Sequence, residues 1–245
     1  MAGKNVVVIG GSRGVGREIV GTVAREGGHV LAVARQDEPL RQLVRDCPGV
    51  KTLSLDATHE DAPSKVFDVL RPDILVICGG AYPPAAALHE LSWREFGVNW
   101  ESDVKIAFHF CKAALLLPLR PGASIVLVSS GAAIGGSPIS GGYAGAKRTQ
   151  MFMASYAQKE SDRLGLGLRF VALAPRIMPD TALGKYAVAG YSRYLGIPAE
   201  DFIGSMGTPP SSADAAAAVV ELATRSDVAH GKAFLLSGVG LEAVP

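Results

Sequence analysis

Val6-Val-Val-Ile-Gly-Gly-Ser-Arg-Gly-Val-Gly16 is the stretch of this sequence that decides its fold. Its apolar β-branched residues predict a buried strand, and the glycines that follow predict a tight turn into a helix near Val15. Glycine lets the backbone approach a pyrophosphate closely, and a helix N-terminus offers free N–H groups to an anion. A glycine-rich loop can also be only a turn, but its place after a first strand favours dinucleotide binding. The candidate contacts in this turn are Gly10, Ser12, Arg13, Gly14, Val15 and Gly16.

Further along the chain, short apolar runs alternate with amphipathic stretches of helical periodicity. The runs predicted as strands are 6–9, 30–34, 50–55, 74–78, 125–129, 168–173 and 233–236. The stretches predicted as helices are 15–26, 38–46, 62–70, 93–117, 142–164 and 213–224. This alternation is typical of a parallel sheet with helices on both faces. We therefore predict a single α/β domain over residues 1–245, built as a Rossmann-like, doubly wound parallel sheet of about seven strands.

The composition narrows the class of protein and of partner. Hydrophobic residues make up 48% of the chain and charged residues 19%, as expected for a well-packed globular protein. A net charge of +1 without basic runs argues against nucleic acid or an anionic membrane as a partner. Cys47, Cys78 and Cys111 are far apart and lack CxxC spacing, which predicts reduced thiols, no zinc site and a cytoplasmic protein. We expect no metal site, because the histidines also lack the spacing of metal ligands.

The end of the second predicted strand bears on the choice of cofactor. A site specific for NAD usually has a carboxylate there for the ribose hydroxyls, whereas this chain has Arg35. A guanidinium suits a 2′-phosphate, and Arg13 in the glycine turn could reach the same group. Both arginines could instead be solvated, with Asp37 and Glu38 as ribose ligands. The pattern favours NADP(H) and does not exclude NAD(H).

Tyr143 and Lys147 carry the chemistry that the sequence predicts. Residues four apart lie on one face of a helix, so the phenol and the ammonium can act on the same ligand. A nearby cation favours the phenolate, so we expect Lys147 to lower the pKa of Tyr143 from its ordinary value of about 10. Ser130 ends the preceding apolar strand and could face the same helix. By itself the YxxxK spacing arises often by chance, with the tyrosine packed and the lysine solvated.

In combination these features resemble the short-chain dehydrogenase/reductase family. The glycine turn, Asn99, Ser130, Tyr143 and Lys147 occur in the family's order, and the match runs from about residue 6 to 181. The resemblance implies hydride transfer between a nicotinamide and a carbonyl carbon, with Tyr143 as general acid or base. It implies that Ser130 binds the carbonyl oxygen, that Lys147 also holds the nicotinamide ribose, and that Asn99 orders a water.

The same resemblance extends the expected cofactor site beyond the glycine turn. It places Asp56 near the adenine, and Ile177 and Thr181 near the nicotinamide amide and the phosphates, with Thr181 as the weaker match. Ala57, Gly79 and Pro175 are further expected cofactor contacts. The chain departs from the family pattern where Ile9 replaces a threonine, Ile77-Cys-Gly-Gly80 replaces Asn-Asn-Ala-Gly, and Arg176 replaces a glycine.

Two segments after strand ends could shape a substrate pocket, namely 81–88 and 177–206. The aromatic and methionine side chains of the second segment are Met178, Tyr186, Tyr191, Tyr194 and Met206. They predict either an apolar lid over a medium-sized, largely uncharged ketone or secondary alcohol, or packing within the fold or at a subunit contact. The family's usual dimer helices, 93–117 and 142–164 here, imply a homodimer or homotetramer.

Three functional classes fit these observations. The first is an NADP(H)-dependent oxidoreductase that interconverts a carbonyl and an alcohol. The second is a related enzyme that uses a bound cofactor for epimerisation or elimination, although such relatives usually carry a longer C-terminal substrate domain. The third is a non-catalytic module that senses NADP, against which the serine, tyrosine and lysine set argues.

Overall fold

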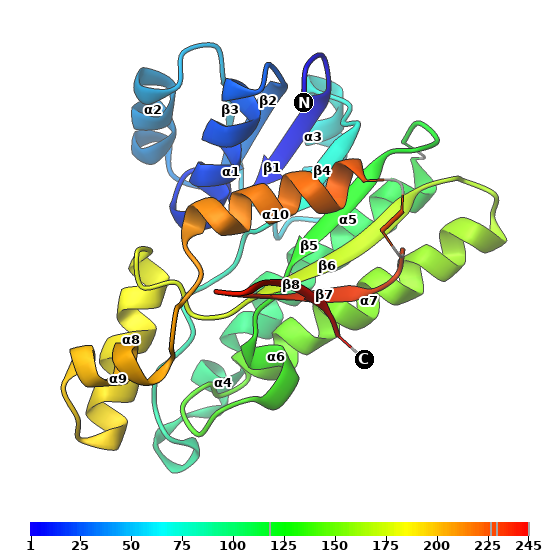
Figure 1. The fold of residues 1–245 in the computed structure, drawn as a ribbon. Helices are drawn as coiled ribbons and strands as arrows, with labels where there is room; N and C mark the ends of the chain where they lie inside the picture. Colours follow the sequence, from blue (N-terminus) through cyan, green and yellow to red (C-terminus); the bar gives the residue numbers. More distant parts are fainter. Residues whose placement is uncertain (118, 226, 229, 245) are drawn as a thin grey trace.

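A computed structural model describes residues 1–117, 119–225, 227–228 and 230–244 of the chain. An eight-stranded sheet forms its centre, in the order β3-β2-β1-β4-β5-β6-β7-β8 (Figure 1). The strands are β1 (Asn5–Ile9), β2 (His29–Ala34), β3 (Lys51–Ser54), β4 (Ile74–Ile77), β5 (Ser124–Val128), β6 (Arg169–Pro175), β7 (Ala233–Ser237) and β8 (Gly240–Ala243). The described part of the chain forms a single α/β domain, and the predicted doubly wound parallel sheet is confirmed. The eighth strand was not predicted, and it pairs antiparallel with β7 at the sheet edge.

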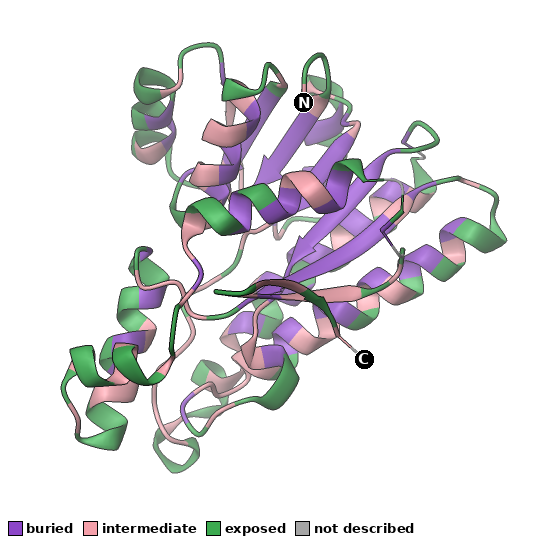
Figure 2. Ribbon diagram, viewed as in Figure 1, coloured by how far each residue is buried: buried purple, intermediate pink, exposed green. Residues whose placement is uncertain are grey.

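Helices cover both faces of the sheet because its central strands are apolar on both sides. In β1, Val6 and Val8 pack against one helical layer while Val7 and Ile9 pack against the other. The first layer contains α1 (Gly14–Arg25), α2 (Asp37–Asp46) and α10 (Ser212–Thr224). The second contains α3 (Ala62–Val69), α5 (Lys105–Leu116) and α7 (Tyr143–Arg163). The buried strands between these layers are visible in Figure 2.

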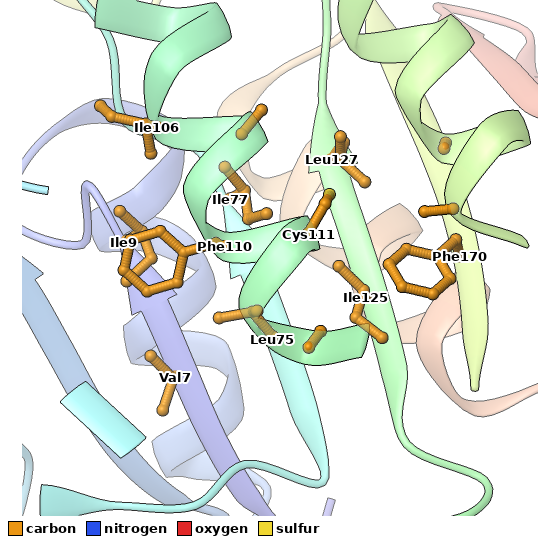
Figure 3. Packing of buried hydrophobic residues seen from close by; sticks show 14 of the residues in the cluster. Val7, Ile9, Leu75, Ile77, Ile106, Phe110, Cys111, Ile125, Leu127 and Phe170 are labelled. Carbon is orange, nitrogen blue, oxygen red and sulfur yellow. The ribbon is translucent and has the colours of Figure 1, made fainter. Parts of the chain in front are cut away.

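Phe110 anchors the second layer on the sheet. Its side chain is fully buried and lies in one cluster with Ile9, Ile77 and Ile125 (Figure 3). Burial of an aromatic ring and its aliphatic neighbours stabilises such a contact by about 2 kcal/mol per side chain. The packing of α5 on β1, β4 and β5 therefore fixes the helix that precedes it in the chain.

The helix predicted over residues 93–117 is interrupted. The structure has α4 (Trp93–Asn99), then a π-helical turn over Trp100–Val104, then α5. Ser92 caps α4, because its hydroxyl accepts a hydrogen bond from the backbone N–H of Glu95. A π-turn adds a residue to the helix and is frequently found at functional sites. Here it carries Asp103, a buried acid, into the interior of the protein.

The segment 177–206 contains two helices that periodicity alone did not reveal, α8 (Ala182–Leu195) and α9 (Ala199–Ser205). Both extend from the end of the sheet where the parallel strands finish (Figure 1). Tyr191 of α8 stacks on Phe202 of α9, with ring centroids 4.8 Å apart. Among the helices that the structure describes, none is long and apolar enough to cross a membrane.

The order of the strands places a crevice at one point of this sheet edge. The chain moves outward from β1 through β2 to β3, then returns to the other side of β1 with β4. Loops that leave β1 and β4 therefore turn away in opposite directions, which opens a ligand site at the carboxyl ends of these strands. Ile9 and Ile77 are register partners there, so Gly10 and Cys78 follow side by side.

Candidate active site

The backbone of the glycine turn packs closely against neighbouring backbone at the base of this crevice. A Cβ atom on Gly10 would lie 2.7 Å from Cα of Gly79, and Gly10 also has a φ of +85°. A Cβ atom on Gly16 would lie 2.2 Å from the carbonyl oxygen of Gly10. Glycine is therefore required at both positions for the first turn of α1 to pack on the loop after β1.

The N-terminus of α1 is open to an anion. Arg13 at the N-cap makes no capping hydrogen bond through its side chain, and the first turn holds no acidic residue. Gly14 has a φ of +50° and faces open space on the side where a Cβ would lie. Free N–H groups, a positive helix end and this lack of side chains fit the pyrophosphate of a dinucleotide. Ser12 is buried beneath the turn, and Val15 packs partly against the core.

Arg13 and Arg35 lie at the rim of the same crevice, and both are exposed. Arg13 donates a hydrogen bond to Oε1 of Gln36, the residue that follows Arg35. Arg35 also lies close enough to Asp56 to stabilise its carboxylate. Partial burial acts to raise the pKa of Asp56, but hydrogen bonds from Thr58 and the charge of Arg35 outweigh it and lower that pKa. The rim therefore combines cations with an ionised carboxylate, and Ala57 next to it is buried.

Tyr143 begins α7 and lies beside Lys147 and Ser130. The ammonium of Lys147 is 5.7 Å from the centroid of the Tyr143 ring. Burial raises the pKa of Tyr143, while the charge of Lys147 and a hydrogen bond with the Ser130 side chain act to lower it, and the net direction is upward. The expected lowering effect of Lys147 on this pKa is therefore confirmed, but burial outweighs it, so the pKa of Tyr143 stays above its ordinary value. Tyr143 is accordingly a neutral phenol that can donate a proton.

Lys147 is held inside the protein by three acceptors. Its Nζ lies 3.0 Å from Oδ1 of Asp103, 3.1 Å from the carbonyl oxygen of Val128 and 3.2 Å from Oε1 of Gln150. An ammonium group has three donors, so all of them have partners in this structure. Burial acts to lower the pKa of Lys147, but Asp103 and Tyr143 favour the charged form, and the net pKa is raised. A ribose hydroxyl can reach this ammonium only by replacing one of the three acceptors.

Asn99 reaches Lys147 through Asp103 and not directly. Its Nδ2 donates to the carbonyl oxygen of Ala81 at 2.8 Å and to Oδ2 of Asp103 at 3.1 Å. These two acceptors fix the orientation of the amide, since a flipped Asn99 would turn its oxygen toward both. Oδ1 of Asn99 is buried and accepts no hydrogen bond from any residue that the structure describes. That oxygen is the atom through which Asn99 could bind the expected water.

Asp103 and Gln150 are the side chains around Lys147 that were not predicted from the sequence, and Asp103 is the charged one. A signal was present, because an acid interrupts a helical stretch four residues after Asn99, at a spacing that puts the two on one face. The π-turn was not visible in the sequence, and it is this turn that carries Asp103.

The remaining predicted contacts lie around the same strand ends. Gly79 adjoins Gly10, and the carbonyl oxygen of Pro175 accepts a hydrogen bond from the N–H of Gly131, which follows Ser130. Ile177 is half-buried in the loop after β6. Thr181 caps α8, because its hydroxyl accepts from the N–H of Gly184 and donates to the carbonyl oxygen of Met178.

An open depression of about 460 Å³ lies between the loop after β4, α4 and α8, and Ser130, Tyr143 and Lys147 are not among its lining residues. Its lining residues are Tyr82, Pro83, Pro84, Arg94, Glu95, Val98 and Tyr186. Tyr82 packs edge-on against Tyr186 of α8, with ring centroids 5.8 Å apart. A Cβ atom on Gly142 would lie 2.0 Å from the carbonyl oxygen of Phe96, so the residue before Tyr143 fits closely against α4. The two segments predicted to shape a pocket therefore meet beside the start of α7.

Comparison with known proteins gives matches over much of the chain. A family model described as short chain dehydrogenase matches residues 4–191. The chain is 31% identical to L-xylulose reductase from Homo sapiens over 134 residues, which cover 53% of this chain and 54% of that protein. It is 30% identical to D-erythrulose reductase from Gallus gallus over 132 residues, covering 52% of this chain and 53% of that protein.

A longer match is to 2-keto-3-deoxy-L-fuconate dehydrogenase from Xanthomonas campestris, 27% identical over 191 residues, which cover 76% of this chain and 62% of that protein. The chain spans about half the length of the two curated reductases it matches. The family model covers well over half of this chain and includes the glycine turn, Ser130, Tyr143 and Lys147. The chain therefore belongs to the short-chain dehydrogenase family.

Proposed function

We propose that this protein is a nicotinamide-dependent oxidoreductase that interconverts a carbonyl compound and an alcohol. The observation that carries this proposal is the cluster of Ser130, Tyr143 and Lys147, in which Lys147 lies 5.7 Å from the ring of Tyr143. The glycine turn supplies a place for the cofactor's pyrophosphate at the crevice between β1 and β4. Relatives named as reductases and dehydrogenases support the same class of reaction.

The roles of the side chains follow from their chemistry. A bound nicotinamide supplies the hydride for reduction of the carbonyl carbon. Tyr143 donates a proton to the carbonyl oxygen, and in the reverse direction it accepts the proton of the alcohol. The Ser130 hydroxyl binds the same oxygen and stabilises its developing negative charge. Lys147 stabilises the Tyr143 oxygen when that group has lost its proton.

The substrate we propose is a medium-sized, largely uncharged ketone or secondary alcohol. Arg94 and Glu95 with the phenols of Tyr82 and Tyr186 offer hydrogen bonds at the depression, which suits hydroxyl-bearing ketones. Relatives named for L-xylulose and D-erythrulose agree with this chemistry. Steady-state assays with NADPH over a panel of ketoses, simple ketones and keto acids test the proposal. Turnover of uncharged ketones supports it, whereas cofactor binding with no turnover of any carbonyl compound would favour the sensing module.

We also propose that the enzyme prefers NADP(H). Replacing Arg35 with serine should raise the KM for NADPH by about tenfold or more and leave the KM for NADH nearly unchanged, because a charge-assisted contact to the 2′-phosphate is lost. Arg41 on α2 is a matched control, since it is exposed and pairs with Glu38 on its own helix. The Arg41→Ser variant should keep both constants. A wild-type enzyme that prefers NADH would contradict the proposal.

The exposed aromatic side chains of α5 and α7 support a homodimer or homotetramer. Phe108 is 51% exposed, Phe152 45% and Tyr156 59%, although all three are large and apolar. Exposed and half-buried residues alternate with buried ones along α7 in Figure 2. Sedimentation velocity should give a dimer or tetramer, and the Phe108→Asp/Phe152→Asp double variant should be a monomer. A monomeric wild-type protein would refute this state.

Three free cysteines agree with the proposed cytoplasmic location.

A further inference from the structure

Asp103 is a buried carboxylate with a complete set of partners. It is 1% exposed and lies in the π-turn between α4 and α5. Its Oδ2 accepts hydrogen bonds from the N–H of Ala81 at 3.0 Å, from Nδ2 of Asn99 at 3.1 Å and from the hydroxyl of Ser102 at 2.8 Å. Its Oδ1 pairs with Lys147. A buried charge is tolerated only with such pairing and hydrogen bonding.

The surrounding chain is built to admit this carboxylate. A Cβ atom on Gly80 would lie 2.5 Å from Cγ and from both carboxylate oxygens of Asp103, so glycine is the residue that fits there. Gln150 of α7 donates from Nε2 to the backbone oxygen of Asp103 at 3.0 Å, and its Oε1 accepts from Lys147. The loop after β4, the π-turn and α7 therefore converge on one ion pair.

This ion pair changes the electrostatic environment of the Tyr143 phenol. Lys147 alone would present a full positive charge to the phenol, and the carboxylate of Asp103 at 3.0 Å from its Nζ offsets that charge. The ionisable groups that act on Tyr143 are Lys147, Asp103 and Cys78. Cys78 is a neutral thiol, because burial raises its pKa to about 11. Asp103, which is paired with Lys147, is thus the group of this set that opposes the Lys147 charge.

We propose that Asp103 is a positioning residue of this active site, which anchors the Lys147 ammonium and keeps Tyr143 a neutral proton donor, so that the site is set for carbonyl reduction. The inference rests on the proposed function. In the oxidation direction Tyr143 must accept the proton of the alcohol, so the Tyr143–Lys147 pair must first lose a proton. The carboxylate of Asp103 raises the pH at which the pair loses this proton. That holds whether the proton comes from Tyr143 or from Lys147.

The Asp103→Asn variant tests this directly through the pH dependence of kcat/KM for alcohol oxidation. Asparagine keeps the shape and some hydrogen bonds but removes the charge. The acidic limb of the profile should move down by about one pH unit, because a pair without the carboxylate loses its proton more readily. The Gln150→Leu variant is the matched control, since it removes a Lys147 contact without changing charge. Its acidic limb should move much less than that of Asp103→Asn, because a neutral acceptor is lost and not a charge.

The possible outcomes separate this inference from the proposed function. The inference is overturned if Asp103→Asn folds, binds cofactor and has its acidic limb at the same pH as the wild-type enzyme. It is also overturned if the acidic limb of Gln150→Leu moves as far as that of Asp103→Asn. If Asp103→Asn does not fold, the wild-type profile decides: an acidic limb above about pH 8 supports the inference, and a limb below it overturns it. A Tyr143→Phe enzyme with wild-type turnover would remove the proposed function itself.

Discussion

Replacing Tyr143 with phenylalanine should lower turnover by about 10²-fold or more, because the substitution removes the hydroxyl that transfers the proton. The ring remains, so the start of α7 keeps its packing beside Lys147, whose Nζ lies 5.7 Å from the ring centroid. Cofactor binding should be retained, since the glycine turn and the arginines of the rim are untouched. Steady-state kcat with NADPH and a fluorescence titration of NADPH measure the two effects separately.

Tyr186→Phe is the matched control for this substitution. Tyr186 lines the depression, and its hydroxyl accepts a hydrogen bond from the N–H of Ala85 at 3.3 Å. Loss of this hydroxyl should change KM more than kcat, because it removes a binding contact and no proton donor. Turnover of Tyr143→Phe within a few-fold of the wild-type enzyme would contradict the role given to Tyr143.

The elements that sequence reasoning located are those with strong local patterns. Runs such as 6–9 and 125–129 are apolar on both faces, and a parallel sheet between helical layers is the arrangement that buries them. The glycine turn could be predicted because its glycines are sterically required. Gly10 and Gly16 each approach another part of the backbone too closely for a side chain. Lys147 was placed beside Tyr143 by the helical period alone.

The features that could not be predicted from the sequence depend on contacts between residues that are distant along the chain. Spacing indicated that Lys147 would lower the pKa of Tyr143, but burial acts in the opposite direction and is larger. Burial is a property of the packed structure and has no local pattern. The π-turn at Trp100–Val104 likewise depends on partners that are distant in sequence, namely Ala81, Lys147 and Gln150. The helices α8 and α9 were not predicted from the sequence. Their mixed aromatic and polar residues pack partly on each other and not on the sheet, so they lack a simple apolar period.

Replacing Lys147 with methionine should reduce both stability and turnover, and a second substitution separates these effects. Methionine keeps the length of the side chain but leaves the carboxylate of Asp103 buried without its counter-charge. Removing one partner of a buried pair lowers the free energy of unfolding by about 3–5 kcal/mol. Turnover should fall by about 10²-fold or more, because no cation then stabilises the deprotonated Tyr143. Urea unfolding and steady-state kinetics measure the two losses.

The Lys147→Met/Asp103→Asn double variant should recover much of the stability, since neither partner is then left as an isolated buried charge. Its turnover should stay low, because the missing cation is not replaced. The two readouts thus respond to different properties of the same pair: stability depends on whether the buried charges balance, and turnover depends on whether a cation stands beside Tyr143. If turnover returned together with stability, Lys147 would act only as a structural partner of Asp103, and the proton-transfer role assigned to the Tyr143–Lys147 pair would be wrong.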